Sequence, residues 1–175
     1  MEQIRYQRRI CTDQEKINTF LQNARAGVVG INHTEYPYAV PVNFIWYKGA
    51  VYFHGVGSGK KFTLLSEKPN VCFTVYEEVG TVTDPVPCHA DTAYMSVMLF
   101  GRAERVDDPE EAADVLQQLL GKFMPGFYKQ KISGQLVSKY RSSLDGMGVA
   151  VFRIVPAELT AKENVAEPDQ LFHPS

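Results

Sequence analysis

Cysteine is scarce in this 175-residue chain, and its spacing suits no cross-link. The three residues, Cys11, Cys72 and Cys88, are odd in number and widely separated, and none belongs to a CxxC pair. Disulfide frameworks use an even set of cysteines, and zinc sites commonly use CxxC pairs. Cys88 stands near His89 and Asp91, but a second ligand set at suitable spacing is missing. We therefore expect neither a disulfide framework nor a metal site, and we interpret this cluster as part of a solvated loop.

Long hydrophobic runs and an excess of charge are also missing. No stretch approaches the roughly 18 apolar residues of a membrane span, and the formal net charge is −2. The pair Arg8-Arg9 resembles an export signal only superficially, because the polar residues 10–16 follow it instead of an apolar segment. These absences argue against membrane and nucleic-acid partners. We expect a cytoplasmic protein.

The composition that remains is that of an ordinary globular protein. Apolar residues make up 45% of the chain and charged residues 22%, with ten Phe and nine Tyr. This content supports a single domain over residues 1–175 with a real hydrophobic core. Residues 1–11 read as an N-terminal arm and residues 166–175 as a loosely ordered tail.

Helices are expected in three places. Residues 12–24 combine a capping box, formed by Thr12 and Glu15, with apolar side chains that share one helical face. Residues 109–122 show the clearest helical pattern, with a proline in the first turn. A shorter helix is expected over residues 60–65.

The rest of the pattern is rich in β-strand signals. Six segments combine β-branched and aromatic residues with turn residues at their ends. They are residues 27–31, 38–46, 50–54, 71–76, 93–106 and 149–155. The first connections are too short for a crossover helix, so these strands are expected to be antiparallel. Pro41 marks an edge or a bulge, and Lys48-Gly49 marks a two-residue hairpin. The prediction is a mainly β domain, a six-stranded antiparallel β-barrel with accessory helices.

Two connections are longer. Residues 77–92 contain Pro85 and Pro87 and read as a loop, long enough to cover a site. Residues 124–145 have no clear periodicity and read as a loop with one further helix.

The most informative motif is the segment 55–61, called the glycine loop below. Its glycines alternate from Gly55 to Gly59, and Lys60 and Lys61 follow at the start of the short helix. Glycines let a backbone approach a ligand closely, and a helix start offers free N–H groups to a phosphate. The spacing matches neither a P-loop nor a GxGxxG dinucleotide motif. A phosphate site and a solvated turn are both compatible with this loop.

His54 ends the third expected strand, directly before the glycine loop. A histidine there can hydrogen-bond a ligand, transfer a proton, or bind a metal or haem iron, although a lone histidine is also often structural. Tyr94 and Ser96 are polar positions in an otherwise apolar strand, which either face outward or line a pocket. No GxSxG or HExxH motif supports a hydrolase.

The order of these segments resembles the FMN-binding split-barrel group related to pyridoxamine phosphate oxidase, and within it the Nim nitroimidazole-resistance proteins. The resemblance rests on PYAVPVNF at residues 37–44, YFHG at 52–55 and GKK at 59–61, and it extends roughly over residues 5–160. It implies a six-stranded split barrel that forms a homodimer, with two flavin sites at the subunit interface.

The resemblance also implies site residues. FMN would lie across the strand that contains Asn43, with its phosphate beside the glycine loop. His54 matches a histidine near the Nim active site, which makes it the expected catalytic residue. The residues implied to bind the cofactor are Val42, Asn43, Phe44, Phe53, His54, Gly55, Ser58, Gly59, Lys60, Lys61, Ser96 and Val97.

The activity implied by the resemblance is that of an FMN-dependent oxidoreductase. Nim proteins are credited with reducing the nitro group of 5-nitroimidazole drugs to an amine, which gives antibiotic resistance, so a small aromatic acceptor is the expected substrate. Residues 79–92 and 123–145 match no pattern and are expected to shape its pocket. The sequence has no nicotinamide motif, so it does not identify the electron donor.

Two alternatives stay open at this point. One is a haem-binding split-barrel protein for haem storage or breakdown, with His54 or His89 as the axial ligand. The other is a flavin-binding module without catalysis of its own.

Overall fold

A computed structural model of the chain describes residues 6–67 and 70–174. Residues 1–5 of the expected arm, Lys68 and Pro69 after the short helix, and Ser175 of the tail lie outside the described residues.

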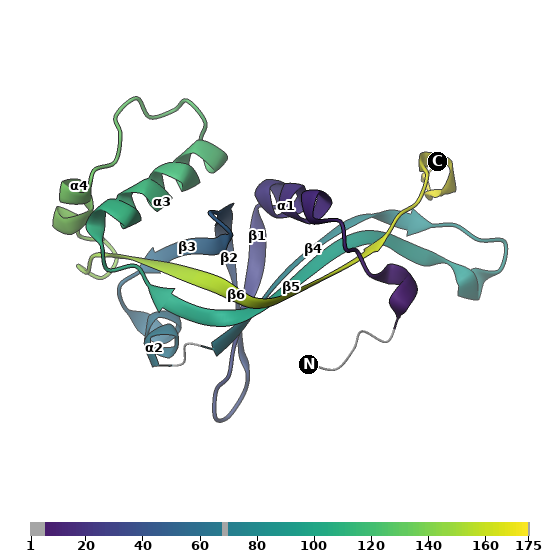
Figure 1. Ribbon diagram of the computed structural model, residues 1–175, viewed down its shortest axis with the longest axis horizontal. Coiled ribbons are helices and arrows are strands. Elements are labelled where there is room, and N and C mark those ends of the chain that lie inside the picture. The colour runs from purple at the N-terminus through teal and green to yellow at the C-terminus, as the bar shows by residue number, and fades with distance from the viewer. Residues whose placement is uncertain (1–5, 68–69, 175) are drawn as a thin grey trace.

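Six antiparallel strands form a closed barrel, as the sequence predicts (Figure 1). Around the barrel, the strands follow the order β1-β2-β3-β6-β5-β4. Their bounds are β1 Ala26–Ile31, β2 Tyr38–Tyr47, β3 Ala50–Val56, β4 Asn70–Val82, β5 Asp91–Arg105 and β6 Val149–Asn164. Short turns join β1 to β2, β2 to β3 and β4 to β5, whereas the connection from β3 to β4 contains α2 and the connection from β5 to β6 contains α3 and α4.

The β2–β3 hairpin turns where the sequence predicts. Lys48 and Gly49 both have positive φ angles, 49° and 74°, which is the geometry of a tight hairpin turn. β3 pairs with β2 only between Phe44 and Tyr47. Pro41 therefore lies on a part of β2 that pairs with β1 alone, and the strand edge expected at this proline is confirmed.

Two predictions about strand length are wrong. Residues 77–82 continue β4 and pair with β5 as far as Val82 and Asp91, so the expected loop 77–92 shrinks to the turn that holds the two prolines. β6 runs nine residues past its expected end at Val155, because a register irregularity opposite Phe100 and Gly101 accommodates Pro156. Sequence patterns end a strand at proline, whereas cross-strand pairing continues it here.

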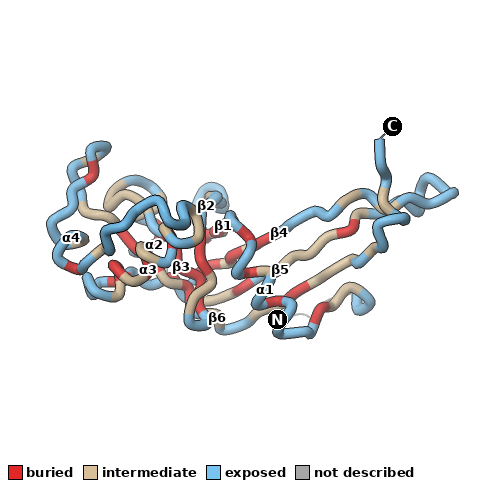
Figure 2. Tube along the Cα trace, turned by 90° about the horizontal axis from the view of Figure 1, so that it is seen from above, coloured by how far each residue is buried: buried red, intermediate tan, exposed pale blue. Residues whose placement is uncertain are grey.

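The extra length of β4, β5 and β6 forms an arm that projects from the barrel (Figures 1 and 2). The C-terminal tail is not loosely ordered as expected, since it lies along this arm. Leu171 forms a β-bridge with Val82, and the Phe172 N–H donates to the Thr81 carbonyl at 2.8 Å.

The helices occupy the predicted regions. They are α1 Gln14–Asn23, α2 Gly59–Glu67, α3 Pro109–Phe123 and α4 Gly134–Lys139, with short 3-10 turns at Gln7–Arg9, Pro87–His89 and Pro168–Gln170. The capping prediction for α1 is off by one residue. Asp13, not Thr12, is the cap, and its carboxylate accepts the Lys16 N–H at 3.1 Å. No helix among residues 6–67 and 70–174 is long and apolar enough to cross a membrane.

The core has two parts. Inside the barrel, the rings of Phe44, Phe53, Phe73 and Phe152 are fully buried, and Phe53 stacks on Phe152 with centroids 5.6 Å apart. A second cluster lies between α3 and the outward side chains of β2, β3 and β6. Burial of each such side chain stabilises the fold by about 1.5–3 kcal/mol.

Lys122, near the end of α3, ties that helix to the barrel. Its ammonium donates to the Ala24 carbonyl at 2.5 Å and to the Phe44 carbonyl at 3.2 Å. Burial, followed by the positive charge of Arg25, lowers the pKa of Lys122 to about 8. The helix that covers β2 and β3 is thus held in place by a polar contact as well as by packing.

Candidate functional site

The glycine loop brings two ammonium groups back onto the barrel. β3 ends at Val56, and α2 begins at Gly59, whose φ of 86° favours glycine. Lys60 turns toward the start of β2, where its Nζ lies 5.2 Å from the centroid of the Tyr38 ring. The loop therefore connects the end of β3 with the start of β2 at one end of the barrel.

Lys61 lies against the backbone of β3. Its Nζ is 2.6 Å from the position that a Cβ on Gly55 would occupy, so only glycine leaves room for it. The side chain is half-buried, and burial lowers the pKa of Lys61. Within the described part of the chain, neither Lys60 nor Lys61 has a carboxylate within ion-pair distance. Two unpaired cations at a helix N-terminus fit a phosphate group.

Ser58 points elsewhere. Its hydroxyl donates to the Asp145 carboxylate at 2.5 Å, and the same carboxylate accepts the Met147 N–H at 3.1 Å. The hydrogen bond from Ser58 lowers the pKa of Asp145, so the group is ionised at neutral pH. The hydroxyl of Ser58, which was expected to bind the cofactor, is therefore engaged within the protein, and a negative charge lies beside the loop.

His54 projects outward from β3, on the side opposite the barrel core. Its ring lines an apolar pocket of about 250 Å³, called the His54 pocket. The other lining residues come from α3, α4, the segment before α4 and β6: Leu116, Ile132, Leu136, Val137, Tyr140 and Val149. Of the two segments expected to shape the substrate pocket, residues 123–145 contribute Ile132, Leu136, Val137 and Tyr140 to the His54 pocket, whereas residues 79–92 lie on the distant arm.

The protonation of His54 follows from these surroundings. One edge of the ring is exposed, yet the packed side chains around it displace water, and this desolvation lowers the pKa of His54. The ammonium of Lys61 lowers it further. Neutral imidazole is thus the resting form at pH 7, which suits a hydrogen-bond partner, a base or an iron ligand better than a proton donor.

The remaining predicted residues fall into two groups. Val42, Phe44, Phe53 and Val97 are buried in the barrel, so only their backbone atoms are available to a ligand. Asn43 is exposed on the outward face of β2, one register step beyond the last β2–β3 pair and next to the corresponding position of His54.

Ser96 is remote from the other predicted site residues of the same chain. His54 pairs with Val151 and Ser96 with Lys162, eleven residues further along β6. At about 3.3 Å per residue this separation is roughly 35 Å along the strand. The structure therefore brings together the glycine loop, His54 and Asn43, and it does not bring Ser96 and Val97 to them within one chain.

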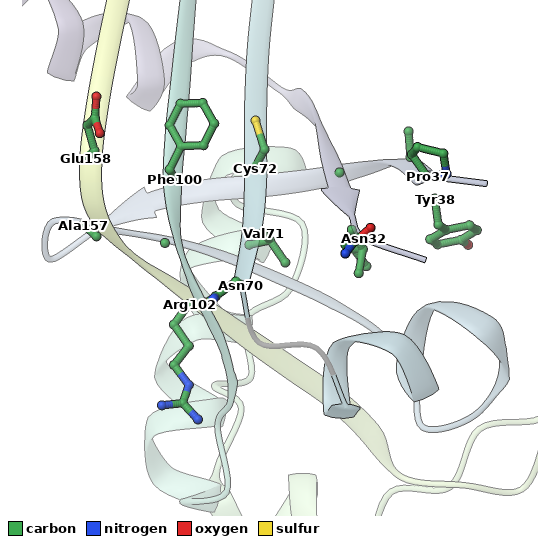
Figure 3. A pocket seen from close by; sticks show the side chains of 14 residues that line it. Asn32, Pro37, Tyr38, Asn70, Val71, Cys72, Phe100, Arg102, Ala157 and Glu158 are labelled. Atoms are coloured by element: carbon green, nitrogen blue, oxygen red, sulfur yellow. The ribbon is translucent and has the colours of Figure 1, made fainter. Parts of the chain in front are cut away.

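A larger hollow lies on the other side of Tyr38 (Figure 3). It has a volume of about 720 Å³ and is formed by the β1–β2 hairpin and the neighbouring ends of β4, β5 and β6. Small residues form part of its lining, and Asn32, Asn70, Arg102 and the carboxylate of Glu158 supply polar groups. Sequence reasoning missed this cavity and the role of Asp145. Asn32, Asn70 and Arg102 stand at or near strand ends. Because strand ends meet at one edge of a sheet, these polar residues were the signal in the sequence that could have indicated the cavity.

The candidate metal cluster of the sequence is not gathered in space. Within residues 6–67 and 70–174, no three His, Cys, Asp or Glu side chains are placed to hold a metal ion. His89 faces Asp84 at 3.5 Å, while Asp91 pairs with Arg9 at 2.5 Å. His89 and Asp91 therefore contact different partners.

Solved structures with a similar fold include proteins that carry flavin or haem. The flavocytochrome Anf3 from Azotobacter vinelandii is 25% identical with a TM-score of 0.76, and the match covers 94% of this chain and 73% of that one. A proposed 5-nitroimidazole antibiotic resistance protein from Bacteroides thetaiotaomicron is 26% identical with a TM-score of 0.65, covering 87% and 85%.

A third similar structure, the FAD and heme binding protein from Mycobacterium smegmatis, is 19% identical with a TM-score of 0.73, covering 92% of this chain and 76% of that one. At this identity the likeness shows the fold alone. No curated protein matches the chain.

The sequence itself carries a family pattern over most of its length. Residues 13–163 match the profile described as pyridoxamine 5'-phosphate oxidase. This span contains all six β-strands but the last residue of β6, together with the glycine loop and His54. The chain therefore belongs to the pyridoxamine 5'-phosphate oxidase family of split barrels.

Proposed function

We propose that the protein is a flavin-dependent oxidoreductase that reduces a small aromatic acceptor such as a nitroimidazole. The observation that carries the proposal is the pair of unpaired ammonium groups at the start of α2, which Gly55 and Tyr38 hold against the barrel. A riboflavin phosphate such as FMN meets the requirement of this loop for an anion. The similarity to a flavocytochrome and to a nitroimidazole resistance protein supports the same reading.

Different residues of this chain would bind the phosphate, support the flavin ring and hold the acceptor. Lys60, Lys61 and the first N–H groups of α2 would bind the phosphate. The outward face of β2 offers a flat floor, since Ala39 and Pro41 are small and Asn43 supplies the one polar side chain. The flavin supplies electron transfer, which no side chain provides. His54, neutral at rest, would hold the acceptor by a hydrogen bond in the His54 pocket.

The size of the His54 pocket limits the acceptor. Its volume of about 250 Å³ lies below the range of about 300–1,000 Å³ that is usual for drug-sized ligands. A single aromatic ring with a small polar substituent is the matching class.

We further propose that the protein works as a homodimer. The outward residues in the middle of β1, β4 and β5 form a continuous face without a charged side chain, called the uncovered face; they are Val28, Gly30, Cys72, Thr74, Tyr76, Ser96, Met98 and Phe100. Such a face with a charged rim is typical of a subunit interface. Ser96 is remote from the His54 of its own chain, so a Ser96 near that His54 would come from the second copy.

A second candidate function is haem binding, and one observation favours it. His54 stays neutral and one edge of its ring is exposed, which suits an axial ligand to a haem that would lie at the mouth of the His54 pocket, since the pocket itself is too small to enclose a haem. The similar flavocytochrome supports this reading too. The two functions predict different residues: Lys60 and Lys61 for flavin, His54 for haem.

The visible absorption spectrum of the purified protein, with the cofactor then released and identified, tests both. Two flavin bands that disappear in Lys60→Gln/Lys61→Gln but persist in His54→Ala would support the oxidoreductase. A Soret band that disappears in His54→Ala would establish haem instead. Flavin bound without any turnover of NADH or NADPH and a nitroimidazole would reduce the function to a flavin-binding module.

A further inference from the structure

The 720 Å³ cavity lies at one end of the uncovered face, called the cavity end. Gly30, Cys72 and Phe100 belong both to the lining of the cavity and to that face. Figure 3 shows Cys72 and Phe100 side by side on β4 and β5, with Glu158 beside them on β6. The face is therefore hollow at this end, and a carboxylate stands at the edge of the hollow.

The opposite end of the uncovered face, called the tyrosine end, carries a projection. Tyr76 is 54% exposed, and its ring lies against that of Tyr94, with the centroids 5.7 Å apart. Ser96 is the register partner of Tyr76 on β5, and Lys162 is the partner of Ser96 on β6. This end thus presents two aromatic rings and an ammonium group, where the cavity end presents a hollow and a carboxylate.

A central row of residues lies halfway between the two ends. Its members are register partners on β1, β4, β5 and β6: Val28, Thr74, Met98 and Thr160. Cys72 lies two residues before this row on β4, and Tyr76 lies two residues after it. Two residues of a strand span roughly 7 Å. The hollow and the projection therefore lie at about equal distances from the row, on opposite sides of it.

Such a face can be complementary to itself. In a two-fold dimer, a residue that contacts a second residue of the partner is contacted by the partner in the same way. In the aligned packing of two sheets, strand directions lie within about 30° of each other. If the strands of the two copies run in opposite directions, the tyrosine end of each copy lies over the cavity end of the other. If they run in the same direction, hollow faces hollow and rings face rings.

Charged side chains at the rim of the face favour opposite directions. Within residues 6–67 and 70–174, Glu158 and Lys162 have no ion-pair partner. They lie on β6 at equal distances from Thr160, so opposite directions would place Lys162 of the partner subunit over Glu158. Arg102 and Glu78 are also unpaired there, and each lies four residues from the central row, at the cavity end and the tyrosine end respectively. They would meet in the same arrangement.

Resting on the homodimer of the proposed function, we propose that the 720 Å³ cavity is the receptor for the Tyr76 and Tyr94 rings of a second copy of this chain. The two-fold axis passes the central row, and the strands of the two copies run in opposite directions. Glu158 pairs with Lys162 of the partner subunit, and Arg102 pairs with the partner's Glu78. The cavity is thus one half of a self-complementary contact, whose other half is the ring pair at the far end of the same face.

Cross-linking through Cys72 tests the direction of the strands. All variants carry Cys88→Ser, which removes the exposed cysteine. With oxidised glutathione, Tyr76→Cys should form a disulfide to Cys72 of the partner subunit, seen on a non-reducing gel as a band at about twice the chain mass of 19.7 kDa. Within one chain these positions lie about 13 Å apart on β4, whereas a disulfide needs Cα atoms within about 7 Å. Adding Cys72→Ser should abolish the band.

Charge reversal tests the pairing at the rim. Lys162→Glu places two carboxylates at each contact and should raise the Kd of the dimer at least about tenfold. Adding Glu158→Lys exchanges the two charges and should return the Kd to within about threefold of the unmodified value. Lys129→Glu, the same charge change at an exposed position on the α3–α4 connection, should leave the Kd unchanged. Light scattering over a dilution series gives these constants.

Three results would overturn the assignment of the cavity while leaving the homodimer in place. They are a dimer in which Tyr76→Cys forms no link, a cross-link in the Cys88→Ser chain that disappears with Cys72→Ser, and a Lys162→Glu defect that Glu158→Lys does not repair. The second result would mean that the strands run in the same direction. An unmodified chain that stays a monomer would overturn the homodimer and the assignment with it. Flavin content and turnover of the same samples test the oxidoreductase separately.

Discussion

The Lys61 ammonium occupies the space of a missing Gly55 side chain, with Nζ 2.6 Å from the position of the absent Cβ. Gly55→Ala should therefore push the end of a flexible side chain aside, at a cost in stability of less than about 1 kcal/mol. Because the displaced ammonium leaves the loop, flavin binding should weaken about tenfold. Urea unfolding and flavin titration of the same preparation measure the two effects.

Gly101→Ala is the matched control for that prediction. A Cβ on Gly101 would lie 2.2 Å from the backbone carbonyl oxygen of Val155, which cannot move aside like a side chain. This variant should lose roughly 2–4 kcal/mol of unfolding free energy. Equal stability losses for the two glycine variants would contradict the placement of Lys61.

Lys61 should also control the protonation of His54. Desolvation first, and then the Lys61 charge, keep the pKa of His54 below its ordinary value of 6.5. Lys61→Met removes the charge, so the pKa of His54 should rise while remaining below the ordinary value, since the desolvation persists. A ¹H–¹⁵N NMR titration of the imidazole between pH 4 and 8 measures the change, with Lys60→Met as the control. An unchanged pKa of His54 in Lys61→Met would show that the Lys61 charge does not act on the imidazole.

Much of the barrel was predictable because it depends on local signals. The Lys48-Gly49 turn, the edge at Pro41 and the alternation along β2 are each encoded by residues within a few positions of one another. The arm was predictable only in β5, because the ends of β4 and β6 are sustained by pairing between residues as distant as Met95 and Glu163. A prediction from local residues ends the strands near Pro85 and Pro156. In the structure the chain turns from β4 to β5 around Pro85, whereas the pairing of β5 with β6 continues past Pro156 through a register irregularity.

The site was predictable in its parts and not in its arrangement. The glycine loop and His54 are adjacent in sequence, so both were found. The pleat of β3, however, points His54 to one side of the strand and the Cβ position of Gly55, where the Lys61 ammonium lies, to the other. Asp145 reaches Ser58 across 87 residues, a contact that no spacing rule contains. Ser96 was noted as a polar position in an apolar strand and was assigned to the cofactor by resemblance, but its separation from His54 becomes visible only in the register of β6.

The Lys122 contact predicts an unusual dependence of stability on pH. Its folded pKa of about 8 lies below the ordinary 10.5, so the unfolded chain binds more protons between these values. Stability contributed by this group must therefore rise as the pH increases from about 8 to 10.5. The difference in unfolding free energy between the unmodified chain and Lys122→Met, measured in urea at pH 7, 8.5 and 10, should shift in favour of the unmodified chain. A difference that stays constant would show that the ammonium is not desolvated in the folded protein.

The uncovered face predicts the assembly state. Met98 is 39% exposed in the single chain and lies on β5 in the middle of this face. The unmodified protein should elute at roughly twice its mass of 19.7 kDa, and Met98→Glu should elute near that mass, because a buried unpaired carboxylate strongly opposes association.

Phe127→Glu is the control for this prediction, since Phe127 is 74% exposed on the α3–α4 connection, away from the uncovered face. It introduces the same charge and should leave the dimer intact. Light scattering gives the mass, and flavin content measured on the same fractions tests the link to the site. If Met98→Glu is a monomer that retains full flavin, the cofactor needs only one chain; if flavin is lost with the dimer, the remote Ser96 region of the second copy belongs to the site.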